Sequence, residues 1–393
     1  MSPLNPFFSI IIYVIAFLAG YLIKLNYKVE SLNGRYESID GMRGFLALGV
    51  FIHHACIWHQ YIQTGTWEAP KSNLYTQFGQ TSVALFFMIT SFLFISKLLN
   101  SNEKGFSWRF FFLSRIFRLV PMYYFSLCLI IISILFMSHW QLNVGLSELL
   151  KSIFNWCFFT IYETPHINNS GFTSYINAGV VQTLPYEWLF YLSLPLISIF
   201  ILKVKPKIGY IILTVVFIII FYKVHGVYEY YIYSFMGGGI APILIKYNRL
   251  IKINDTIASI IVLICLFLIV QFSSAVSVFG ILLLTVIFTQ IALGASLFGL
   301  LKNSTLKFLG TISYSTYLLH GILLFTVYYF GFGFEKIKLL TPLEYCLVVF
   351  SLTPALLLIS FLGFKYVEKP NIDRAKIIIQ KLTKSPKTQP SLK

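Results

Sequence analysis

The residues with the clearest chemical potential are two adjacent histidines, His53 and His54, in an apolar stretch that begins after Arg43. Ionisable side chains inside a membrane-spanning helix are costly and usually functional. Eleven helical steps separate Arg43 from His54, which places both on one helix face, roughly 16 Å apart along the axis. His53 points about 100° away from His54, so only one of them can face a given cavity. The spacing predicts a cation at one end of a cavity and a proton acceptor deep within it.

The composition indicates an integral membrane protein. The 393 residues are 57% hydrophobic and only 11% charged, whereas soluble domains carry about 25% charged residues. Apolar runs long enough to cross a bilayer recur along the whole chain. They predict an all-α bundle of about eleven transmembrane helices, near residues 7–23, 43–60, 80–97, 119–138, 185–202, 208–222, 230–246, 256–272, 277–299, 310–331 and 344–365.

Connections between these runs are mostly short, so no soluble domain of useful size is expected. The longest connection, between residues 138 and 184, contains a weakly apolar piece at 153–161. This piece is too short to span a bilayer, and we predict an interfacial or re-entrant helix there. The first apolar run lacks a preceding basic segment and a small-residue cleavage site, so it reads as a retained span.

Lysine and arginine alternate between loops as the positive-inside rule requires. Only five of the 30 basic residues fall in the loops of one side: Lys71, Lys151, Lys223, Lys336 and Lys338. The pattern predicts a cytoplasmic C-terminus, an N-terminus outside, and an outer position for loop 139–184. The net charge of +16 therefore reflects topology, and nucleic acid is not an expected partner.

The five cysteines are scattered, and their spacing matches no metal site, so neither a disulfide framework nor a metal centre is predicted. Buried thiols that behave as small hydrophobic side chains are the simpler interpretation.

The predicted topology places further ionisable residues. His320 lies about ten residues into its span, at a depth close to that of His54. Glu187 lies at the outer end of the 185–202 segment, so these three side chains are predicted to share a cavity that faces outward. His320 could instead be a hydrogen-bonding strut between helices.

A basic cluster is predicted at the inner mouth, formed by Arg43, Arg115 and Arg118. Guanidinium groups there have the planar geometry that suits phosphate. Arg115 and Arg118 could instead serve only as topology determinants at the end of a span.

Five segments follow one another in an order that resembles a known family. They are Asp40 to Gly44 leading to His54, Leu85 to Leu93, Arg115 to Tyr123, Thr183 to Tyr191, and the pair Ile312 to His320 with Val367 to Pro370. Together they resemble the motifs of membrane acyltransferase family 3 over residues 37–370. Further candidate site residues within or beside these segments are Asp40, His53, Tyr123, Tyr317 and Glu368.

The chain departs from the family pattern at two places. Thr90-Ser91 replaces a Ser-Gly step of the second motif, and an extra span with a basic linker, residues 1–36, precedes the family region. After Pro370 only a Lys-rich segment, residues 371–393, is expected at the cytoplasmic face, so the chain resembles the form without an esterase-like domain.

The resemblance implies an O-acyltransferase of the cell membrane that takes an acyl group, most often acetyl, from cytoplasmic acyl-CoA. The acceptor implied is a hydroxyl of a cell-surface glycan or lipid-linked sugar outside the membrane. Arg43, Arg115 and Arg118 would bind the phosphates of acetyl-CoA, His54 would act as general base or nucleophile, and Glu187 would bind the sugar. Direct attack and an acyl-enzyme both remain open.

A secondary transporter or flippase for a lipid-linked sugar or organic anion is the alternative. Intramembrane His and Glu with an inner arginine cluster also suit a proton-coupled carrier. The lack of a convincing internal repeat and the odd number of predicted spans weigh against this alternative.

Overall fold

The structure, a computed structural model, describes residues 2–27, 36–101, 106–202, 206–225, 228–246, 253–272 and 274–384, and these contain helices but no strand. The helices of the first half are α1 (Pro6–Asn26), α2 (Glu37–Thr64), α3 (Asn73–Leu99), α4 (Trp108–Met137), α5 (Leu146–Cys157), α6 (Thr173–Ile176) and α7 (Leu184–Leu202). Those of the second half are α8 (Ile208–His225), α9 (Glu229–Lys246), α10 (Asp255–Val270), α11 (Val278–Ala292), α12 (Ser304–Thr311), α13 (Ser313–Phe325), α14 (Phe334–Lys338), α15 (Pro342–Gly363) and α16 (Lys369–Lys384).

Each of the eleven predicted segments coincides with a helix, which confirms the polytopic all-α fold class. Within the described residues, five helical stretches are long and apolar enough to span: α1, α3, α4, α13 with its π-helical continuation, and α15 continued into α16. The apolar helices α8, α10 and α11 are shorter. The total of eleven spans stays a prediction.

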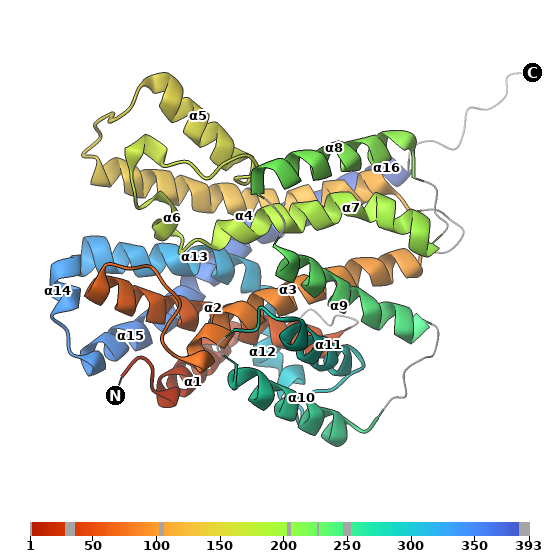
Figure 1. The fold of residues 1–393 in the computed structure, drawn as a ribbon, viewed down its shortest axis with the longest axis horizontal. Coiled ribbons are helices and arrows are strands. Elements are labelled where there is room, and N and C mark those ends of the chain that lie inside the picture. Colours follow the sequence, from red (N-terminus) through yellow and green to blue (C-terminus); the bar gives the residue numbers. More distant parts are fainter. Residues whose placement is uncertain are drawn as a thin grey trace, which may run out of the picture.

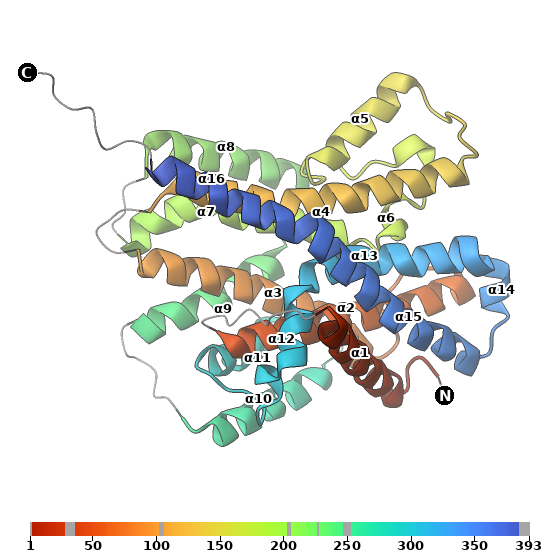
Figure 2. The same cartoon turned by 180° about the vertical axis from the view of Figure 1, so that it is seen from behind.

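The long helices run in broadly the same direction, with α2 and α3 at the centre of the bundle (Figure 1). Helix α3 packs on α2 and α9, α13 packs on α2 and α15, and α1 packs on α15. Figure 2 shows α16 continuing from α15 and lying along α4. The first part of the predicted Lys-rich tail is therefore a helix, whereas residues 385–393 and most of the basic linker lie outside the described residues.

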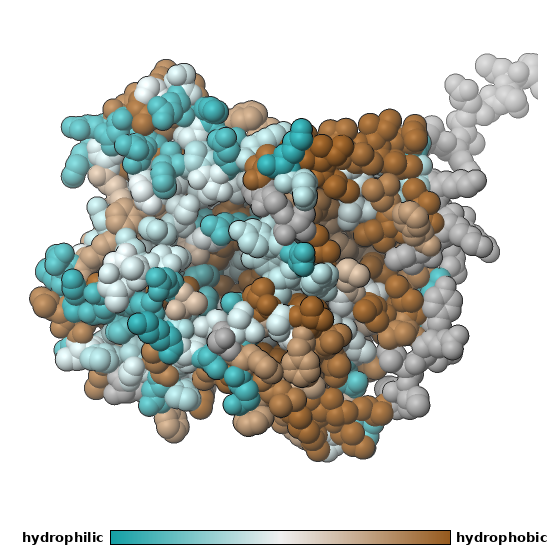
Figure 3. Space-filling model, viewed as in Figure 1, coloured by the Kyte–Doolittle hydropathy of each residue, from teal (hydrophilic) through white to brown (hydrophobic). Residues whose placement is uncertain are grey.

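Polar and apolar surfaces are separated along the bundle. Figure 3 shows apolar side chains gathered over α8 and α10, and hydrophilic side chains near α5 and α14. Ile212 and Ile219 on α8, and Leu263 and Phe267 on α10, are exposed. A large exposed apolar surface is unfavourable in water and favourable against lipid, which is consistent with a multi-pass membrane protein.

The predicted short helix of the long connection is α5, and it begins earlier than expected, at Leu146. Leu146, Leu150, Phe154 and Phe158 are exposed at intervals of four residues, so they form one apolar stripe. Trp156 is buried on the opposite face. This pattern is typical of a helix that lies at a membrane interface rather than crossing it.

Two glycines allow α2 to touch its neighbours closely. A Cβ atom on Gly310 of α12 would lie 1.8 Å from the Asp40 carbonyl oxygen and 3.5 Å from the Arg43 Cβ atom. A Cβ atom on Gly41 would lie 1.9 Å from the Leu301 carbonyl oxygen. These neighbours are backbone atoms, which cannot move aside easily. A side chain at either glycine would therefore push α2, and Arg43 with it, away from α12 or from the segment at Leu301.

Gly310→Ala is therefore expected to lower the free energy of unfolding by about 1–3 kcal/mol or more, because the α2–α12 contact must open. Thermal unfolding of the purified protein in detergent measures this as a lower Tm. Gly209→Ala is the control: a Cβ atom there meets nothing within 4 Å, and alanine favours the helix. Equal melting temperatures for the two variants would contradict this account of the α2–α12 contact.

Candidate active site

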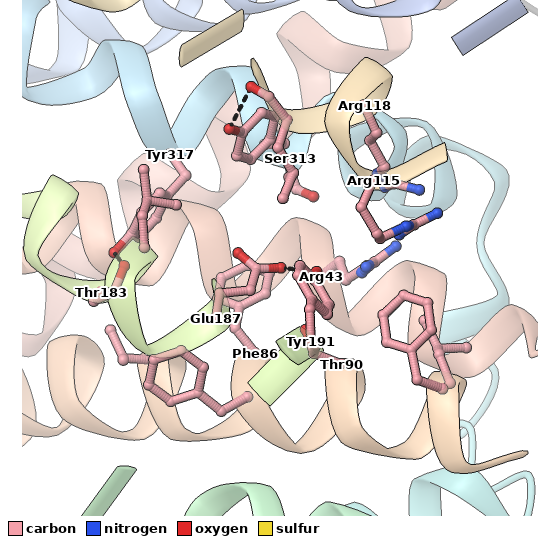
Figure 4. Close-up of a pocket in the computed structure, with 17 residues that line it drawn as sticks. Arg43, Phe86, Thr90, Arg115, Arg118, Thr183, Glu187, Tyr191, Ser313 and Tyr317 are labelled. Carbon is pink, nitrogen blue, oxygen red and sulfur yellow. Dashed lines mark hydrogen bonds between the residues drawn. The ribbon is translucent and has the colours of Figure 1, made fainter. Parts of the chain in front are cut away.

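Three arginines line one cavity of about 110 Å³ between α2, α3, α4, α7 and α13. Arg43 comes from α2, and Arg115 and Arg118 are one turn apart on α4. Figure 4 shows the three guanidinium groups gathered at one end of the cavity, with Thr183 and Tyr317 at the other. The predicted basic cluster is thus a single site, built from helices that are distant in the sequence.

The arginines have no direct acidic partner. In the described part of the chain, none of the three forms an ion pair, and the buried Nε atoms of Arg43 and Arg115 have no hydrogen-bond partner. The Arg115 guanidinium lies 4.8 Å from the centre of the Phe94 ring. Half-buried charges without an ion pair are costly, and an anion in this cavity would supply the acidic partner that the three arginines lack.

Three carboxylates interact with this cluster at longer range. They are Asp40 at the start of α2, Glu187 on α7, and Glu368 after α15. Glu368 is 1% exposed and accepts a hydrogen bond of 3.1 Å from the Ser315 hydroxyl group. These carboxylates reduce the net positive charge of the region without forming direct ion pairs with the arginines.

The structure corrects the predicted position of Glu187. It was expected beside His54 and His320, but it lines the arginine cavity and accepts a hydrogen bond from the Tyr191 hydroxyl group (Figure 4). The reason is that α7 begins inside the bundle rather than at its surface: Leu184 is buried, and the backbone at Asn177 contacts Gly321 of α13. A loop that enters the bundle carries the first turn of α7 with it.

His54 and His320 are brought into direct contact. Their Nδ1 and Nε2 atoms lie 2.9 Å apart, and their rings are stacked with centres 5.0 Å apart. His320 is fully buried, whereas His54 is half-buried. The motif at 312–320 and helix α2 therefore meet at these two histidines, which were predicted to lie at a similar depth.

The donor and acceptor in the bond between His54 and His320 follow from the second hydrogen bond of His320. The Thr316 carbonyl oxygen, 3.2 Å from His320 Nδ1, can only accept, so the Nδ1 atom of a neutral His320 carries the proton. His320 Nε2 is then an acceptor, and His54 Nδ1 must donate to it. This leaves the lone pair of His54 Nε2 available, which is the arrangement a general base requires.

His53 has a different role in the packing. Its Nδ1 atom donates to the Tyr75 carbonyl oxygen at 2.7 Å. Its ring fills the space beside Gly79, where a Cβ atom would lie 2.4 Å from it. His53 thus joins α2 to α3 and does not line the arginine cavity.

Tyr317 connects the two groups of ionisable residues. It lines the arginine cavity, and its hydroxyl group lies 2.8 Å from the Thr183 hydroxyl group. Its ring centre is 6.1 Å from that of His320. The remaining predicted residue, Tyr123, lies outside the cavity. It donates to the Trp156 carbonyl oxygen and stacks on Phe159, so it fixes the end of α5 against α4.

Several residues that line the arginine cavity have no role predicted from the sequence, among them Thr90, Thr183, Tyr191 and Tyr314. Tyr191 could have been identified from the sequence, since it follows Glu187 by four residues and so lies on the same helix face. The other three face the cavity only because of how helices far apart in the chain are packed.

The structure also accounts for the Thr90-Ser91 departure. Thr90 lines the arginine cavity, and Ser91 packs against α9. A Cβ atom on Gly239 would lie 3.1 Å from the Ser91 hydroxyl oxygen, and one on Gly238 would lie 2.2 Å from the Met88 carbonyl oxygen. The small residues that permit this close contact are thus on α9, opposite the serine.

Comparison with known proteins identifies the family of the chain. No curated protein and no solved structure matches the chain. The model of the acyltransferase domain of family 3 matches residues 36–362, far more than half of the chain. The match takes in Arg43, His54, Arg115, Arg118, Glu187 and His320. The chain therefore belongs to membrane acyltransferase family 3 and is a membrane acyltransferase.

Proposed function

We propose that this acyltransferase moves an acetyl group from cytoplasmic acetyl-CoA to a hydroxyl group of a glycan or lipid-linked sugar on the other side of the membrane. The observation that carries the proposal is the pair of sites on one face of α2. Arg43 belongs to an arginine cluster that forms no ion pair with the described residues, and a histidine with an available nitrogen lies about three helical turns away at His54. A donor that is both anionic and long would engage both sites.

Donor binding is assigned to the arginines. The pyrophosphate of coenzyme A would lie against Arg43, Arg115 and Arg118, whose planar groups donate paired hydrogen bonds to phosphate oxygens. The pantetheine arm would extend past Tyr317 and bring the thioester to His54. Glu187 neighbours the arginines, so we assign it to positioning the donor site rather than to binding the sugar.

Acyl transfer would proceed from His54. His54 Nε2 takes the proton of the acceptor hydroxyl group, the resulting oxygen attacks the thioester carbonyl carbon, and the carbon–sulfur bond breaks. The proton then passes from His54 to the departing thiolate, giving free CoA and the acetyl ester. A route in which His54 first accepts the acetyl group gives the same products. His320 acts through His54 by holding its tautomer.

Acceptor binding is assigned to aromatic side chains beyond His54. Tyr61 lies two turns further along α2, and its ring packs against Trp67 and Tyr175. The Trp67 and Tyr175 rings are stacked with centres 4.9 Å apart. Aromatic faces combined with polar edges suit sugar rings.

Orientation is the first test. We expect loop 139–184 and Lys71 to face outside and Arg109 to face the cytoplasm, because the basic residues are divided between the two sides so unequally. Single cysteines at Lys71, Tyr162 and Arg109, introduced after removal of the native cysteines, can be labelled with a membrane-impermeant maleimide in intact cells. Labelling of position 109 alone would reverse the proposed positions of donor and acceptor.

The reaction itself is tested with labelled acetyl-CoA added to inverted vesicles that contain the full-length protein. Label is expected in a lipid- or glycan-linked ester that mild alkali releases. Vesicles without the protein give the background, and the absence of any label above it would reject the proposed donor.

A further inference from the structure

A second cavity, of about 540 Å³, opens beside the arginine cavity at the end of α3. We propose that it binds the adenosine 3′-phosphate end of the acyl-CoA donor, with Lys97 recognising the 3′-phosphate and Phe110 stacking on the adenine. The proposal rests on the acyl-CoA dependence proposed above and specifies which part of the donor each cavity takes.

The two cavities are adjacent, and the charged residues that line them interact. Leu93 lines both, and the Phe94 ring of the arginine cavity packs edge-on against Phe111 of the second cavity, with centres 5.2 Å apart. Lys97 and Arg115 are close enough to interact electrostatically. One extended anionic molecule can therefore occupy both.

Among the described residues that line this cavity, Lys97 is the cation. It forms no ion pair in the described part of the chain, and its ammonium group lies 5.8 Å from the centre of the Phe106 ring. Lys246, a second described lysine near the end of α3, donates to the Leu99 carbonyl oxygen at 3.1 Å. An ammonium group suits a phosphate monoester, which carries a charge between −1.5 and −2 at neutral pH.

The remaining lining suits a nucleoside. Phe110 is half-buried, and its ring has no aromatic partner among the described residues, unlike those of its neighbours Phe106 and Phe111. Hydroxyl and amide side chains complete the wall, at Ser96, Asn100, Ser101 and Ser107. The volume lies within the range typical of small-molecule sites.

The order of groups along the donor matches this arrangement. With the thioester at His54 and the pyrophosphate at Arg43, the nucleotide must extend away from His54. In the proposed orientation this is the cytoplasmic direction, in which α3 ends and the second cavity opens. Adenine and the 3′-phosphate would enter last and leave first.

The test is binding of CoA and 3′-dephospho-CoA to the full-length protein in nanodiscs, measured by titration calorimetry. Wild type is expected to bind CoA roughly tenfold or more tightly than 3′-dephospho-CoA, because a charge-assisted hydrogen bond is lost. In Lys97→Ala this preference should fall to near one, while affinity for 3′-dephospho-CoA stays unchanged. Arg109→Ala removes an exposed cation from the same turn of α4, whose side chain does not line the cavity, and should keep the preference.

A second variant tests the adenine. Phe110→Ala should weaken CoA and 3′-dephospho-CoA equally, by about tenfold, and leave 4′-phosphopantetheine unaffected. No preference in wild type, a preference that survives Lys97→Ala, or an equal loss in Arg109→Ala would each overturn the site, as would an unchanged affinity in Phe110→Ala. If wild type binds neither CoA nor 3′-dephospho-CoA, the proposed donor itself is wrong.

Discussion

His54→Ala is expected to reduce ester formation about 10²- to 10⁴-fold, because the proposed proton acceptor of the reaction is lost. His54 Nδ1 donates to His320 Nε2 at 2.9 Å, which leaves His54 Nε2 available to the substrate. Expression should be retained, with a loss of stability of about 1–3 kcal/mol, because Nε2 of the fully buried His320 loses its donor. Transfer of label from acetyl-CoA in inverted vesicles measures the effect.

His53→Ala is the matched control, since the same substitution is made one position away. His53 donates to the Tyr75 carbonyl oxygen and packs against Gly79, so its loss should cost about 1–3 kcal/mol of stability. Protein that remains folded should keep most of its activity. Full activity in His54→Ala would end the proposed mechanism, and equal near-total loss in both variants would show that their separate roles are misassigned.

Arg43→Lys should weaken donor binding roughly ten- to a hundredfold, even though the positive charge is kept. Lysine lacks the planar pair of donors that a phosphate engages, and the α2–α12 contact leaves the backbone no freedom to compensate. Arg43→Ala should be at least as severe. CoA binding to the protein in nanodiscs measures both variants, and their Tm should stay close to that of wild type.

Arg109→Lys makes the same chemical change on the exposed surface of α4 and should leave CoA affinity unchanged. Unchanged affinity in both Arg43 variants would remove Arg43 from the donor site. A loss of binding accompanied by a much lower Tm would assign Arg43 to folding instead.

Local sequence patterns were sufficient to predict the helices and the faces of α2. Apolar runs determine where a chain in a membrane must be helical, because every backbone polar group needs an internal partner there. The helical repeat alone places Arg43 and His54 on one face and turns His53 away. The alternation of basic residues predicts the orientation from composition, without any knowledge of packing.

The tertiary structure decided which residues meet. The contact between His54 and His320 joins positions 266 apart in the chain, and only the predicted depth suggested it. Glu187 was misplaced because its position was inferred from the end of an apolar run, whereas the loop before α7 enters the bundle and carries that residue to the arginines. Likewise, the glycines that accommodate Ser91 lie on α9. Helix periodicity is a local property and can be read from one segment, but a cavity is defined by several packed segments, and no single segment contains that information.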